Sequence, residues 1–178
     1  MPKYVLFAVG KDRPGIVASI TGVLYNYDCN LEDSSMTILR DQFAIILVVD
    51  VPESTDVSEL ENSVNSTCRE LSLFYVMKPL DGDGGDTDKY YTHCIIKVFG
   101  EDRTGIVYRI SKVLAEKGVN ICDLRTKITS GDRKLYAMII ETEVPYGVTV
   151  EEIEEELKRV GEELNVDVVV EEVPVIRL

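Results

Sequence analysis

The spacing of apolar residues in the first half of the chain predicts four strands. Apolar segments of strand length occur at 4–9, 31–39, 42–51 and 73–77. Only Arg40 and Asp41 separate the second segment from the third, so a tight hairpin is the expected connection between them.

Two helices are predicted between these strands. The first covers 14–27, with Asp12 as its expected N-cap, and its apolar face consists of Ile16, Ile20, Val23, Leu24 and Tyr27. Asp56 and Glu59 mark the start of the second helix, which ends near residue 69. The elements of the first half therefore follow the order βαββαβ.

The second half repeats this order at an offset of 90 residues: GKDRPGIV at 10–17 recurs as GEDRTGIV at 100–107. Its strands and helices are predicted at 91–99, 105–117, 121–128, 135–144, 151–164 and 166–172. Thr149 and Glu152 form an expected capping box for the last helix. A duplication of this kind predicts two domains, 1–80 and 89–178, joined by a linker rich in Gly and Asp at 81–88.

Two βαββαβ units predict an α+β protein made of two tandem ferredoxin-like modules, each an antiparallel sheet with both helices on one face. The segments 43–49 and 136–140 are apolar at successive positions, so both faces of these strands are expected to be at least partly buried. A module of about this size buries only about 60% of the surface that its unfolded chain exposes. We therefore expect the modules to pair or the chain to form a homodimer.

Charge and composition exclude several classes of partner. The formal net charge is −13, with 32 acidic against 19 basic side chains, which argues against direct binding of nucleic acid and against an anionic membrane surface. The longest apolar run, 43–49, is too short to span a bilayer, and secretion is not expected, because the apolar segment 5–9 is followed by Lys11, Asp12 and Arg13 and by no small-residue cleavage site. The four cysteines, Cys29, Cys68, Cys94 and Cys122, show no metal-binding spacing and are expected to be reduced thiols in the cytoplasm.

The repeated Gly-x-Asp-Arg-x-Gly-Ile-Val motif falls at a strand-to-helix turn, where unpaired backbone N–H groups form an anion site. Asn30 and Asn120 begin the next strand, and we expect that point to return beside the loop. This place would then form a pocket for a zwitterion, whose carboxylate would meet the helix amides and whose ammonium would lie near Asp or Asn. The alternative is structural: the glycines serve turn geometry, Asp12 and Asp102 cap helices, and the arginines are surface charges.

The motif Asp-Arg-Pro-Gly-Ile-Val, followed by Asn-Leu-Glu-Asp-Ser, resembles the ACT domain, and so does the second copy with Asn-Ile-Cys-Asp. Two copies without an attached enzyme resemble the glycine cleavage system transcriptional repressor family. The resemblance implies that a small amino acid binds at an interface between modules. The contacts that it implies are Asp12, Arg13, Pro14, Gly15, Ile16, Asn30 and Leu31 in the first copy, and Asp102, Arg103, Thr104, Gly105, Ile106, Asn120 and Ile121 in the second. Thr104 stands where the first copy has a proline, so the two sites are not expected to be equivalent.

Catalytic, metal and cofactor sites are not expected. No nucleophile–base pair and no set of metal ligands occurs at a spacing typical of an active site. The only histidine, His93, lies beside Cys94 on a strand, where neighbouring side chains point to opposite faces. The leading hypothesis is a non-catalytic amino acid sensor that controls a partner protein, such as a transcription regulator. The alternatives are a scaffold whose ligand pocket is vestigial and an enzyme of unrecognised type.

Overall fold

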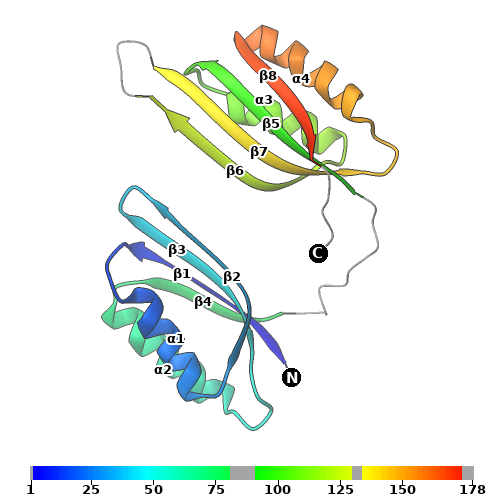
Figure 1. Cartoon of the computed structure of the whole chain (residues 1–178). Coiled ribbons are helices and arrows are strands. Elements are labelled where there is room, and N and C mark those ends of the chain that lie inside the picture. The colour runs from blue at the N-terminus through cyan, green and yellow to red at the C-terminus, as the bar shows by residue number, and fades with distance from the viewer. Residues whose placement is uncertain (1, 81–90, 130–133, 174–178) are drawn as a thin grey trace. The chain divides into compact units, whose positions relative to one another are not determined.

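The computed structural model describes residues 2–80, 91–129 and 134–173. The chain divides into two compact units, Met1–Gly85 and Asp86–Leu178, which we call unit 1 and unit 2. Each contains one four-stranded antiparallel sheet and two helices (Figure 1). The predicted linker at 81–88 lies outside the described residues.

Unit 1 has the predicted order of elements, and its strands are arranged in the sheet as β2-β3-β1-β4. Its elements are β1 (Lys3–Lys11), α1 (Ile16–Asn26), β2 (Asn30–Leu39), β3 (Gln42–Asp50), α2 (Val57–Glu70) and β4 (Phe74–Pro79). The central strands β1 and β3 pair along their whole length, from Lys3 opposite Asp50 to Lys11 opposite Gln42. The hairpin between β2 and β3 turns at Arg40, whose φ is 60°.

Unit 2 repeats the arrangement with the sheet order β6-β7-β5-β8. Its elements are β5 (Tyr91–Glu101), α3 (Ile106–Glu116), β6 (Asn120–Ile128), β7 (Leu135–Pro145), α4 (Val150–Leu164) and β8 (Val166–Val173). Both edge strands β2 and β6 contain a bulge near their start, at Glu32 and at Cys122. The predicted α+β architecture of two ferredoxin-like modules is confirmed.

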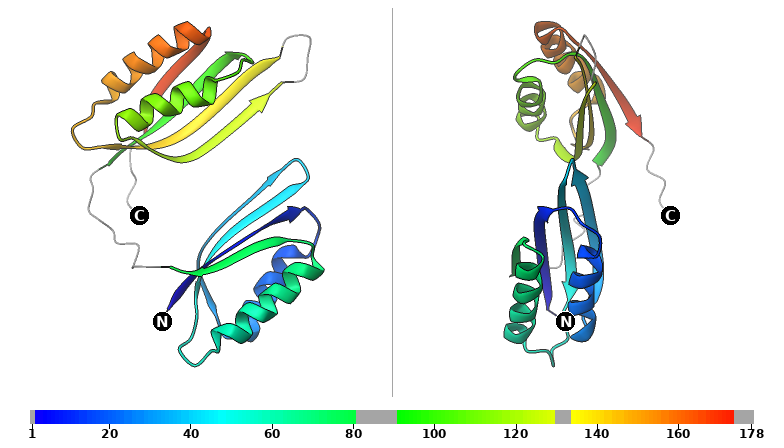
Figure 2. Two further views of the ribbon diagram at one scale, coloured as in Figure 1. Left: turned by 180° about the vertical axis from the view of Figure 1, so that it is seen from behind. Right: turned by 90° about the vertical axis from the view of Figure 1, so that its left-hand side faces the viewer.

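In each unit both helices cover the same face of the sheet (Figure 2). Alternate residues of β1 and β3, such as Leu6 and Leu47, are buried against Ile20 of α1 and Leu60 of α2. Unit 2 has its own core, in which Ile96 and Ile140 take the corresponding places. The apolar helix face predicted for 14–27 is confirmed, since Ile16, Ile20 and Leu24 are buried.

Helix starts differ between the first and the second helix of each unit. The predicted caps of the second helices are confirmed: the Asp56 carboxylate accepts from Ser58 N–H at 2.8 Å, and Thr149 forms a capping box with Glu152. The predicted Asp12 cap is wrong, because β1 runs on to Lys11 and α1 begins only at Ile16. Gly15 is the N-cap, and it has no side chain to cap the helix.

The second face of each sheet is open in the single unit. On β3 the alternate residue Ile46 is 47% exposed, and on β7 Ile139 is 44% exposed. Burial of both faces of these strands, as expected from their apolar runs, therefore requires association with another surface and stays a prediction.

Candidate ligand-binding site

The loop between β1 and α1 is held in place by two hydrogen bonds. The backbone N–H of Asp12 donates to the carbonyl oxygen of Asp41 at 2.8 Å, which ties the loop to the β2–β3 hairpin. The guanidinium of Arg13 donates to the carbonyl oxygen of Glu70 at 3.0 Å, at the end of α2. Arg13 thus has a structural partner, although its side chain is exposed.

At the end of this loop, Gly15 adopts a left-handed conformation with φ 97°. Its carbonyl oxygen accepts from the N–H of Ser19, and no side chain caps the amides of the first turn. In unit 2, Gly105 has φ 95° and α3 also starts without a side-chain cap. Since uncapped first-turn amides and the helix dipole favour an anion, both loops are suited to bind a carboxylate.

A hollow of about 490 Å³ lies beside the loop of unit 1, and its walls are mostly apolar. Met36 and Ile38 of β2 and Phe43 of β3 line it together with loop residues 12–16 and the first turn of α1. Met36 and Ile38 are 52% and 47% exposed. Sequence reasoning missed these three residues, although the alternation of β2 places Met36 and Ile38 on the helix side, opposite Ile45 and Phe43.

The expectation that Asn30 returns beside the loop is wrong. Asn30 pairs with Asp50, which pairs with Lys3 at the start of β1, whereas the loop follows Lys11 at the end of β1. The chain must run back along α1 before β2 begins, and a helix of 11 residues spans about 16 Å. Asn120 is separated from its loop in the same way, because it pairs with Glu143 of β7, which pairs with His93 near the start of β5.

A second hollow, of about 550 Å³, lies at the Asn30 end of unit 1. Asn30 and Leu31 line it with the small residues Ala18 and Gly22 and with Tyr25 of α1. Tyr25 is 79% exposed and Leu31 39%. The residues predicted to bind one ligand therefore fall into two groups, one at each end of α1, and no single unit joins them.

The corresponding residues of unit 2 are arranged differently. Asp102 is tied to the hairpin by its N–H, which donates to the carbonyl oxygen of Lys134 at 3.2 Å, and Arg103 and Thr104 are exposed. The amide of Asn120 donates to the Glu143 carboxylate at 3.2 Å. Asn30 forms no side-chain hydrogen bond within the described part of the chain. The two copies therefore differ at the asparagine, and the unequal use of the two sites expected from Thr104 stays a prediction.

Within the described residues, neither a metal site nor a Cys–His pair is formed. Across residues 2–80, 91–129 and 134–173, no three side chains of His, Cys, Asp or Glu lie where they could hold one metal ion. His93 and Cys94 point to opposite faces, as predicted: Cys94 is buried in the core, and His93 lies on the open face of the sheet. Within the same ranges no helix is long and apolar enough to cross a membrane.

Comparison with known proteins agrees with the fold of two βαββαβ modules. The ACT domain model matches residues 4–78 and 92–171. The UPF0237 protein of Methanopyrus kandleri is 38% identical over 82 residues, which are 46% of this chain and 91% of that protein. The glycine cleavage system transcriptional repressor of Escherichia coli K12 is 27% identical over 90% of this chain and 85% of its own.

Two solved structures share the whole architecture. An unknown protein from Galdieria sulphuraria superposes with a TM-score of 0.81 at 28% identity, over 97% of this chain and 99% of its own. A putative glycine cleavage system transcriptional repressor superposes with a TM-score of 0.71 at 19% identity, over 97% of both chains, and shows the shared fold. This chain belongs to the ACT domain family, as a tandem ACT protein similar along its length to the glycine cleavage system transcriptional repressor.

Proposed function

We propose that this protein is a non-catalytic amino acid sensor, in which a small amino acid binds between unit 1 of one chain and unit 1 of a second copy. The separation of the two groups of ligand residues by the length of α1 is the observation that supports this proposal most directly. A second unit in the opposite direction brings its Asn30 end to the loop of the first. Each ligand then contacts two subunits.

The edge strand β2 supports this assembly. All ten of its residues are exposed, and Leu39 is exposed to 71%. Its stretch 34–39 contains no charged side chain, and charged side chains are one of the devices that keep an edge strand from pairing with another strand. An antiparallel pair of two β2 strands is symmetric about a two-fold axis, which is the commonest symmetry of homodimers.

The ligand chemistry follows from the groups at the interface. The uncapped amides of α1 receive the carboxylate, and the Asp12 carboxylate with the side-chain carbonyl of Asn30 of the partner subunit receives the ammonium. The hollow lined by Met36, Ile38 and Phe43 takes the amino acid side chain. An apolar hollow of this kind favours a small aliphatic side chain over a charged one.

The output of the sensor is a change in assembly. Ligand that binds only the paired arrangement shifts the population toward it, and typical couplings of about 1–3 kcal/mol are enough for graded control. A repressor name among the relatives suggests transcription as the process controlled. The net charge of −13 favours a basic protein partner over direct contact with DNA. Four free cysteines fit the cytoplasmic location that we propose.

A thermal-shift screen against the common amino acids tests the proposal. At a concentration 100 times its dissociation constant, the right ligand stabilises the folded protein by about 2.7 kcal/mol. Asn30→Ala should reduce this shift strongly, and the matched variant Asn120→Ala should leave it unchanged, because Asn120 lies in unit 2 and already donates to Glu143. A dimer that forms normally but responds to no amino acid would favour the scaffold function instead.

A further inference from the structure

The open face of the unit 1 sheet consists of rows of side chains, because residues that pair across neighbouring strands lie on the same face. Its two central rows contain no charged side chain. In the strand order β2-β3-β1-β4, the first row is Ser35, Ile46, Phe7 and Val76, and the second is Thr37, Ala44, Val9 and Phe74. Phe74 is 65% exposed and Val76 42%, so unit 1 itself leaves this apolar surface in water.

The next row of this face carries one charge at each end. Asp33 of β2 and Lys78 of β4 flank Val48 and Val5, which connect them across the sheet. Three strand spacings separate the two charged residues by about 14 Å, which is too far for an ion pair within one unit. Both side chains are exposed, and neither forms an ion pair with another side chain of the described residues.

A two-fold axis parallel to the strands makes this face complementary to itself. Rotation about the axis places β2 of one copy over β4 of the other, and β3 over β1. Asp33 then lies opposite Lys78 of the partner subunit, and the symmetry forms this ion pair twice. Packed sheets lie about 10 Å apart, a gap that extended lysine and aspartate side chains bridge together. Side-chain size also matches, since the small Thr37 lies opposite the partner subunit's Phe74.

The area of the face is sufficient for a weak but specific interface. The strands β1 and β3 have nine residues each and β4 has six. At the usual strand spacing and rise, the four strands cover about 500–600 Å². Two such faces bury about 1,000–1,200 Å² in total, which reaches the lower end of the range for specific interfaces. A transient association is therefore expected, and not a permanent one.

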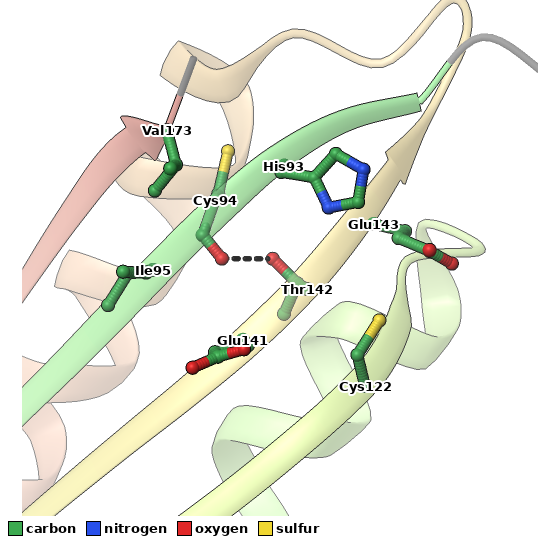
Figure 3. Close-up of a pocket in the computed structure, with 8 residues that line it drawn as sticks. All are labelled: His93, Cys94, Ile95, Cys122, Glu141, Thr142, Glu143 and Val173. Carbon is green, nitrogen blue, oxygen red and sulfur yellow. Dashed lines mark hydrogen bonds between the residues drawn. The ribbon is translucent and has the colours of Figure 1, made fainter. Parts of the chain in front are cut away.

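The same face of unit 2 is not complementary to itself. The two ends of the equivalent row are both acidic, Asp123 and Glu171. A third carboxylate, that of Glu141, lies in the row between them, where unit 1 has a valine (Figure 3). Lys97 lies in the next row, 2.6 Å from the Glu171 carboxylate. Two copies of this face would set Asp123 opposite Glu171 of the partner subunit, and these like charges repel.

We propose that the open face of unit 1 binds the same face of a second copy, as a two-fold sandwich of two sheets. Burial of the central rows supplies the free energy, and the ion pairs between Asp33 and Lys78 of the partner subunit fix the orientation. The proposed amino acid site lies along α1, on the side of the sheet that the helices cover. The sandwich therefore uses a different surface and does not depend on the ligand.

Serial dilution of the full chain, followed by NMR, tests this proposal. The backbone amides of Phe7, Ile46 and Val76 should shift together on dilution, with a dissociation constant on the order of 100 µM. Lys78→Asp and Asp33→Lys should each weaken the association about tenfold or more, because like charges then meet twice. The combined exchange Asp33→Lys with Lys78→Asp restores opposite charges and should return the dissociation constant to within about threefold of the original.

A matched control and a direct contact measurement complete the test. Asp123→Lys, at the position of Asp33 in unit 2, should leave the association unchanged. A mixture of ¹³C-labelled and unlabelled chains should show an intermolecular NOE between Ile46 and Phe7 of the partner subunit. The proposal is overturned if these amides do not respond to dilution, if the combined exchange does not restore association, or if the NOEs of Ile46 lead to another part of the chain. None of these results bears on the amino acid screen, which measures ligand binding.

Discussion

The glycines of the duplicated motif have two different structural roles. Gly15 and Gly105 have positive φ at the helix starts, and a Cβ added at either meets no atom within 4 Å. Gly10 and Gly100 lie inside strands, where a Cβ would touch the chain at the start of β4 or β8. The interpretation of all four as turn glycines is therefore correct only for Gly15 and Gly105.

Replacement of these strand glycines by alanine should destabilise unit 2 more than unit 1. At Gly100 a Cβ would lie 2.9 Å from the carbonyl oxygen of Asn165, whereas at Gly10 the nearest carbonyl oxygen, that of Ser72, is 3.1 Å away and the closest atom, at 2.7 Å, is the end of the Leu73 side chain. We expect Gly100→Ala to lower the free energy of unfolding of unit 2 by about 2–3 kcal/mol and Gly10→Ala to lower that of unit 1 by about 1 kcal/mol. Native-state hydrogen exchange measures both. Equal losses would contradict this account.

The exposed thiol of Cys122 should react slowly. Burial and the carboxylates of Glu143 and Glu141 raise its pKa, so its thiolate fraction at neutral pH is small. Glu143→Gln removes a negative charge and a hydrogen bond acceptor, which lowers the pKa and should speed alkylation by iodoacetamide severalfold. Mass spectrometry of the Cys122 peptide follows the rate, with the Cys29 peptide as the internal control. An unchanged rate would show that the carboxylate does not act on the thiol.

At the scale of elements, the two long edge strands differ in charge. β2 presents Ser35 and Thr37 where β6 presents Arg125 and Lys127, as the pairing of each strand with its neighbour shows. Charged residues on an edge strand oppose its pairing with another strand. β2 is therefore the edge suited to self-association, and β6 is protected against it.

Exchange of these residues should change the oligomeric state. Ser35→Arg with Thr37→Lys puts the charges of β6 onto β2 and should convert the proposed dimer to a monomer, because like charges meet at the two-fold axis. Analytical ultracentrifugation measures the effect. Arg125→Ser with Lys127→Thr is the matched control and should leave the dimer intact. A dimer that survives the β2 exchange would place the interface elsewhere.

Sequence reasoning was most reliable for the elements themselves. The order of strands and helices, the Arg40-Asp41 hairpin and the caps at Asp56 and Thr149 could be predicted because each depends on residues close in the chain. The position of Asn30 relative to the loop could not, because it depends on the direction in which α1 returns across the sheet. Likewise, the hollow at Met36 depends on which face of β2 the helices cover.

For the whole molecule, the two cores share no residue. Leu6 belongs to the core of unit 1 and is fully buried, and Ile96 belongs to that of unit 2. We expect Leu6→Ala to reduce hydrogen-exchange protection in unit 1 by about 2–5 kcal/mol and to leave the protection of unit 2 unchanged. The reciprocal variant Ile96→Ala serves as the control. Parallel losses in both units would mean that they unfold as one.

Because the Asp12 loop and Asn30 lie at opposite ends of α1, the proposed sensor responds to the concentration of the protein itself as well as to the amino acid. A ligand whose contacts come from two copies is held only by the associated protein, so its apparent affinity rises with the amount of protein present. Cells that make little of this chain would need more amino acid to reach the same response. The response threshold would then be set by gene expression as well as by metabolite level.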